Sequence, residues 1–140
     1  MSTQHIVIVG SGFGGLGMGI RLKQAGIHDF TILEQGPEVG GTWRDNHYPG
    51  AACDVESHLY SYSFEPNPRW SRRFAPQQEI LSYLIHCADK YQVRPHIRFG
   101  CAATSARFDD QSGTWEVNTS DGKMIHCRTL VAACGGLSKP

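Results

Sequence analysis

The chain has 140 residues, and its 13 Lys and Arg residues balance its 13 Asp and Glu residues, so the formal net charge is zero. This length suits one domain, and the lack of a basic surplus argues against nucleic acid and anionic membranes as partners. The sequence shows no secretory leader and no apolar stretch near the roughly eighteen residues of a membrane span, which favours a cytoplasmic protein.

The cysteines and histidines predict neither disulfides nor a metal site. The five cysteines are odd in number and lack CxxC spacing, so we expect reduced thiols. The seven histidines are scattered and form no HxxxH pair. Metal chemistry is therefore not expected.

Residues 5–34 follow the pattern of a dinucleotide-binding βαβ unit. The β-branched run 5–9 predicts a strand, and Gly10, Gly12 and Gly15 follow it at the spacing GxGxxG. Gly10 would allow a tight turn, Gly12 the close approach of a diphosphate, and Gly15 the close packing of the helix on the strand. The diphosphate would lie at the helix N-terminus, where free amides and the macrodipole favour negative charge.

A second apolar strand, 30–33, is followed by Glu34, nineteen residues after Gly15. A carboxylate here can accept hydrogen bonds from the ribose hydroxyls of an ADP moiety, and it would repel the 2′-phosphate of NADP. The pattern therefore predicts a site for FAD or NAD. The alternative is a glycine-rich turn beside an ordinary surface glutamate. Two more glycines in the helix, Gly17 and Gly19, suggest close contact with the sheet, although Gly19 could simply be tolerated.

The next segment, 36–75, has few periodic apolar positions and reads as a long functional loop. A helix is predicted over 76–91, because Pro76 suits a first helical position and an apolar stripe follows it.

Alternating residues over 97–127 predict a small antiparallel meander, and the continuous apolar run 129–134 predicts a strand buried in a parallel sheet. The expected fold is α/β: a Rossmann-like doubly wound parallel sheet with the meander attached, in one domain over 1–140. The parallel strands would be 5–10, 30–34 and 129–134.

The segment from Gly40 to Phe64, GGTWRDNHYPGAACDVESHLYSYSF, resembles the corresponding stretch of class B flavoprotein monooxygenases, most closely the Baeyer–Villiger monooxygenases. With GSGFGG, Glu34 and the closing ACGGLSKP, the resemblance covers essentially the whole chain. It implies that the first site holds FAD rather than NAD, and that the chain is the N-terminal part of the FAD-binding domain. It also implies an NADPH- and O₂-dependent oxidation of a small ketone to an ester or lactone, with the NADPH site outside this chain.

The resemblance assigns roles residue by residue. Asp54 would be the catalytic carboxylate near the flavin, paired with an arginine of the NADPH domain. The residues implied to bind FAD are Gly10, Ser11, Gly12, Phe13, Gly14 and Gly15 at the diphosphate, Glu34 and Gln35 at the adenosine, Ala103 at the adenine, and Gly41, Thr42, Trp43, Asn46, Tyr48, Asp54 and Tyr60 along the ribityl chain and flavin.

The chain also departs from the family pattern. It lacks a second GxGxxG, the family fingerprint with its His and Trp-Pro, the C-terminal return of the FAD fold, and the arginine partner of Asp54. We therefore expect a fragment or a natural truncation that is not catalytically competent alone, whose uncovered faces could drive self-association. The alternatives are a non-catalytic dinucleotide-binding module, an N-hydroxylating or sulfur-oxidising flavin monooxygenase, and a fragment of an NAD-dependent oxidoreductase.

Overall fold

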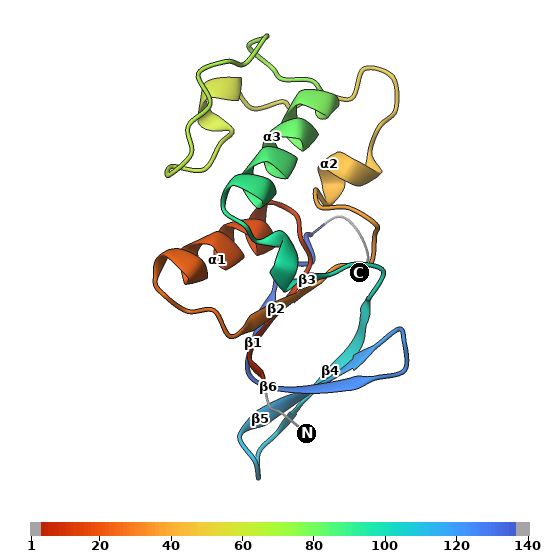
Figure 1. The fold of residues 1–140 in the computed structure, drawn as a ribbon. Coiled ribbons are helices and arrows are strands. Elements are labelled where there is room, and N and C mark those ends of the chain that lie inside the picture. Colours follow the sequence, from red (N-terminus) through yellow and green to blue (C-terminus); the bar gives the residue numbers. More distant parts are fainter. Residues whose placement is uncertain (1–3, 137–140) are drawn as a thin grey trace.

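The computed structural model describes residues 4–136, which form a mixed sheet with helices packed on it (Figure 1). The sheet has six strands in the order β3-β2-β1-β6-β5-β4. The strands are β1 Gln4–Val9, β2 Phe30–Leu33, β3 Ile97–Arg98, β4 Ala103–Asp109, β5 Thr114–Thr119 and β6 Met124–Ala132. β3, β2, β1 and β6 pair in parallel, whereas β6, β5 and β4 pair antiparallel. The expected Rossmann-like α/β class, with a parallel sheet and a meander, is confirmed.

In the part of the chain that the structure describes, three α-helices and two short 3₁₀ turns connect the strands. The helices are α1 Phe13–Gln24, α2 Thr42–Asp45 and α3 Gln77–Lys90, and the 3₁₀ turns are Ser57–Leu59 and Arg94–His96. The segment expected as a loop, 36–75, is thus mostly irregular but contains α2 and the first 3₁₀ turn. Within residues 4–136, none of the helices has the length and apolar character that a membrane crossing requires.

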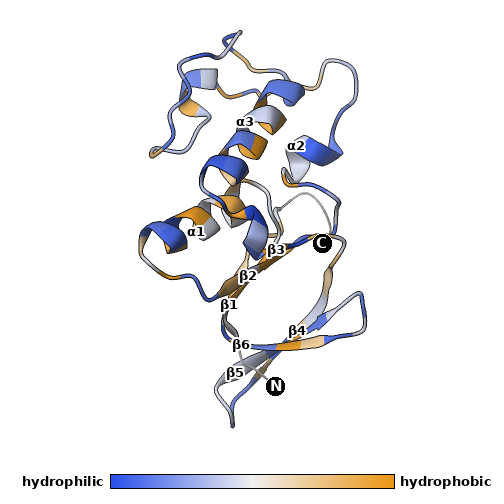
Figure 2. Ribbon diagram, viewed as in Figure 1, coloured by the Kyte–Doolittle hydropathy of each residue, from blue (hydrophilic) through white to orange (hydrophobic). Residues whose placement is uncertain are grey.

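The two faces of the central strands are covered differently. On one face, α1 and α3 pack on β1 and β2, and the buried side chains include Leu16 and Ile20 of α1 and Leu84 of α3. On the other face, Val7 and Leu33 pack against residues of the meander, among them Val117. Figure 2 shows the apolar residues concentrated along the central strands and the sides of the helices that face them.

Two details of the sheet differ from the sequence-based expectation. β3, expected to begin the meander, instead pairs in parallel with β2 through Ile32 and Ile97. The meander's last strand and the expected parallel strand 129–134 are one strand, β6. Cys127 of β6 pairs with Trp115 on the meander side and with Gln4 on the other. No glycine or proline interrupts β6, so the chain passes from the meander into the parallel sheet without a turn.

Close packing explains the glycines at the start of α1. Gly10 has φ +98°, a conformation that other residues rarely adopt. A Cβ on Gly15 would lie 1.7 Å from the carbonyl oxygen of Gly10, so helix and strand end are in direct backbone contact. A Cβ on Gly19 would lie 3.0 Å from the side chain of Ile32. Gly19 therefore lies close to β2, although its neighbours there are side-chain atoms and not backbone.

Candidate functional site

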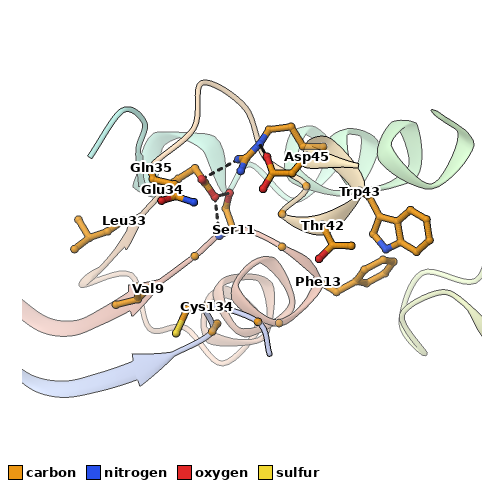
Figure 3. A pocket seen from close by; sticks show the side chains of 18 of the residues that line it. Val9, Ser11, Phe13, Leu33, Glu34, Gln35, Thr42, Trp43, Asp45 and Cys134 are labelled. Carbon is orange, nitrogen blue, oxygen red and sulfur yellow. Dashed lines mark hydrogen bonds and ion pairs between the residues drawn. The ribbon is translucent and has the colours of Figure 1, made fainter. Parts of the chain in front are cut away.

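A cavity of about 630 Å³ lies where β1, β2 and β6 end. These strands are parallel, so their carboxyl ends share one edge of the sheet, the usual position for ligands in open α/β sheets. The volume is in the range of small-molecule and cofactor sites. Figure 3 shows Glu34 and Gln35 toward one end of the cavity and Phe13 and Trp43 toward the other.

Most of the residues predicted to bind the cofactor line this cavity. They are Gly10, Ser11, Gly12, Phe13, Gly14, Glu34, Gln35, Gly41, Thr42, Trp43, Tyr60 and Ala103. Gly15 does not line it, since its role is packing. Asn46 and Tyr48 line a neighbouring depression that shares Thr42 and Trp43 with the cavity. Asp54 is exposed and lines neither hollow.

The floor of the cavity is a glycine cradle built from two loops. Gly12 is the N-cap of α1 and Gly41 the N-cap of α2, and a Cβ on Gly12 would lie 3.6 Å from the Cα of Gly41. The amide of Gly40 donates to the carbonyl of Ser11 at 3.0 Å, which ties the two loops together. The first-turn amides of α1 have no acceptor within the helix, so they are available to an anion.

Glu34 is the buried charge at one end of the cavity, with 3 % of its surface exposed. Its Oε2 accepts hydrogen bonds from the amide of Ser11, at 3.0 Å, and from the Ser11 hydroxyl. Its Oε1 accepts from the amide of Gly36 at 2.8 Å and lies 2.8 Å from Nη1 of Arg44. Figure 3 shows the contacts between Glu34 and Ser11 as dashed lines.

Arg44, like Gly36, belongs to this network but was not predicted from the sequence. Its guanidinium also donates to the carbonyl of Glu38 at 2.6 Å and to Asp45 at 2.8 Å. It passes over Gly36, where a Cβ would lie 2.5 Å from Nη1. Arg44 compensates the charge of Glu34, so the repulsion of a 2′-phosphate expected from Glu34 alone is weakened.

The protein holds Glu34 in its ionised form. Burial raises the pKa of a carboxyl group, but the hydrogen bonds from Ser11 and Gly36 and the charge of Arg44 outweigh burial, and the pKa falls below its ordinary value of 4.5. The carboxylate is therefore available as an acceptor at neutral pH.

This lowered pKa predicts an acid-dependent loss of stability. A group whose folded-state pKa is depressed stabilises the fold above its unfolded pKa, and this contribution disappears as the pH falls through the folded value. We expect the free energy of unfolding to fall more steeply below about pH 4.5 in the wild type than in Glu34→Gln. Urea unfolding at several pH values between 7 and 3 measures both slopes, and identical slopes would contradict the assignment.

Aromatic side chains form the end of the cavity opposite Glu34. The indole nitrogen of Trp43 donates to the hydroxyl of Tyr60 at 3.1 Å, and the ring of Phe13 meets that of Tyr60 edge-on at 5.0 Å. Burial raises the pKa of Tyr60, so its hydroxyl stays protonated. The Tyr62 hydroxyl donates to the carbonyl of Phe13 at 2.6 Å, which fixes the start of α1 against this cluster.

The cavity fits an adenine dinucleotide with a second aromatic group. It joins a carboxylate acceptor, a glycine-lined cradle at a helix N-terminus and an aromatic wall in one elongated space. Side chains at Gly12 or Gly41 would narrow the gap between the two loops, where backbone alone now stands. These are the features that ribose, diphosphate and a flat ring require in turn.

Comparison with known proteins finds a family model and several relatives that match this chain. Residues 8–76 match the NAD(P)-binding Rossmann-like domain family. A Baeyer–Villiger monooxygenase of Streptomyces coelicolor is 50% identical over 97% of the chain and 26% of its own length. Another, from Pseudomonas aeruginosa, is 45% identical over 96% of the chain and 26% of its own length. The chain thus spans about a quarter of the length of the curated relatives that it matches.

Solved structures agree with the sequence relatives. An oxidized steroid monooxygenase bound to NADP superposes with a TM-score of 0.93 at 42% identity, over 99% of this chain and 27% of that one. A complex of OTEMO with FAD and NADP superposes with a TM-score of 0.91 at 37% identity, over 98% of this chain and 26% of that one. By sequence and by fold, the chain is similar to Baeyer–Villiger monooxygenases, and it covers about a quarter of their length.

Proposed function

We propose that this chain is the FAD-binding segment of a Baeyer–Villiger monooxygenase. The observation that carries the proposal is one cavity that joins the ionised Glu34, the Gly12–Gly41 cradle and the Trp43–Tyr60 pair. Glu34 would accept from the adenosine ribose, and the cradle would hold the diphosphate. OTEMO, a relative by structure, forms a complex with FAD and NADP.

The remaining residues would act around these contacts. Gln35 lines the cavity next to Glu34, and Ala103 lines it at the start of β4. Both residues can border the adenosine from these positions. The resemblance implies a place for Phe13 at the diphosphate, but its ring contacts Tyr60, so Phe13 and Trp43 would border the flavin and exclude water from it. Asn46 and Tyr48, in the neighbouring depression, would extend this wall.

The reaction proposed for the whole protein is the NADPH- and O₂-dependent oxidation of a small ketone to an ester or lactone. The bound flavin supplies the oxygen-activating chemistry. Asp54 is exposed, which suits a carboxylate that pairs with an arginine from outside this chain and acts near the flavin. A cytoplasmic location accords with five unpaired cysteines, and self-association remains a prediction from the sequence.

Glu34→Gln tests the adenosine assignment. The amide replaces a charged acceptor with a neutral one, so we expect ADP binding to weaken by about 1 to 2 kcal/mol. FMN lacks the adenosine ribose, so its affinity should stay the same. Isothermal titration calorimetry with ADP and FMN measures both, and equal losses would place Glu34 away from the ribose.

A further inference from the structure

Every acceptor position of the Glu34 carboxylate is already taken by a protein donor. A carboxylate offers about four such positions, two on each oxygen. Oε2 faces the amide and the hydroxyl of Ser11, and Oε1 faces the amide of Gly36 and Nη1 of Arg44. A ribose that donates two hydroxyl groups to Glu34 must therefore displace two of these four donors.

The two backbone donors are held in place by the fold. The Ser11 amide belongs to the loop between β1 and α1, and that loop is fixed by the bond from the Gly40 amide to the Ser11 carbonyl, at 3.0 Å. The Gly36 amide lies three residues after the end of β2, where the Gly36 carbonyl also accepts from the amide of Gly100 at 3.1 Å. Moving either amide would disturb the parallel sheet edge.

The two side-chain donors can leave at much lower cost. The Ser11 hydroxyl changes direction by rotation about one bond. Arg44 keeps two other acceptors, the Glu38 carbonyl at 2.6 Å and the Asp45 carboxylate at 2.8 Å, when it releases Glu34. Asp45 lies on α2 beside the cavity, so the guanidinium remains paired with a carboxylate.

We infer that the Ser11 hydroxyl and the Arg44 guanidinium occupy the positions on Glu34 that the two ribose hydroxyls take, and that ligand binding exchanges them. This inference rests on the proposed function, since it concerns the ribose of the same cofactor. It makes Ser11 and Arg44 affinity-determining residues: they keep the buried carboxylate satisfied, and the ligand must compete with them. Part of the free energy gained at the ribose is thereby offset by the two contacts that are lost.

Crystal structures of the wild-type chain with and without ADP test the exchange directly. With ADP bound, we expect O2′ and O3′ of the ribose within hydrogen-bond distance of Glu34. The Ser11 hydroxyl should have turned away, and Arg44 should be paired with Asp45 only. If ADP binds while either side-chain donor stays on Glu34, the exchange is wrong and the proposed function survives. If ADP does not bind at all, both fail.

Ser11→Ala gives an independent measurement in solution. Pyrophosphate is the matched ligand, because any contact of the Ser11 hydroxyl with phosphate is common to both ligands, whereas the exchange at Glu34 occurs only with ADP. We expect the ratio of ADP affinity to pyrophosphate affinity to rise about five-fold in Ser11→Ala, the value of one net hydrogen bond. The rise should vanish in a Glu34→Gln background. An unchanged or lower ratio would overturn the inference.

Discussion

Replacing Gly15 with alanine should prevent stable folding. The added Cβ would lie 1.7 Å from the carbonyl oxygen and 2.8 Å from the carbonyl carbon of Gly10, and both are backbone atoms that no rotamer change can move. This clash can be relieved only if α1 moves away from β1, and that movement would disturb the core packing of Leu16 and Ile20. We expect the free energy of unfolding to fall by about 4 kcal/mol or more, which is a large part of the stability of a small domain.

Gly14→Ala is the matched control, one residue earlier in the same helix. Its Cβ would lie 3.6 Å from the Cβ of Ala133, an ordinary contact, and alanine has the higher helix propensity by about 1 kcal/mol. Urea unfolding of both variants, together with soluble yield, provides the comparison. Equal midpoints for the two variants would show that α1 does not contact β1 as closely as described.

Gly12→Val should abolish dinucleotide binding without unfolding the chain. Gly12 has φ −74°, which valine can adopt, and a Cβ would meet only Gly41, at 3.6 Å or beyond. The valine methyl groups would nevertheless fill the cradle between the two loops. We expect ADP affinity to fall by more than about 100-fold, as a close backbone approach to the diphosphate is lost.

The measurement for Gly12→Val is a titration with ADP, accompanied by circular dichroism and urea unfolding. The unfolding free energy should change by no more than about 1 kcal/mol, because valine is only a poorer N-cap than glycine. Unchanged ADP affinity in a folded variant would mean that the diphosphate lies elsewhere.

The parts of the fold that local sequence signals control could be predicted. The spacing of Gly10 and Gly15 is dictated by a turn with positive φ and by contact between helix and strand, both of which involve neighbouring residues. The position of β3 could not be predicted in this way. A two-residue strand carries no information about its partner, and β3 reaches β2 only because α3 returns the chain to that side of the sheet.

The same distinction applies to the site. Glu34 follows from the strand, turn, helix, strand pattern, whereas its partner Arg44 comes from a loop without periodicity. Gly36 and Gly40 leave room for the Arg44 side chain, and that glycine spacing was the available signal. The resemblance to a family predicts a role near the flavin for Asp54, and the structure shows only that this side chain is exposed.

The central claim is that the cavity binds FAD through its adenosine half, and a flavin titration tests this most directly. The chain is titrated with FAD and, separately, with FMN, and binding is followed by flavin fluorescence. The structure predicts one FAD per chain, bound at least about ten-fold more tightly than FMN, because only FAD can use Glu34 and the complete diphosphate cradle. Equal affinity for the two flavins, or no binding of FAD, would contradict the account.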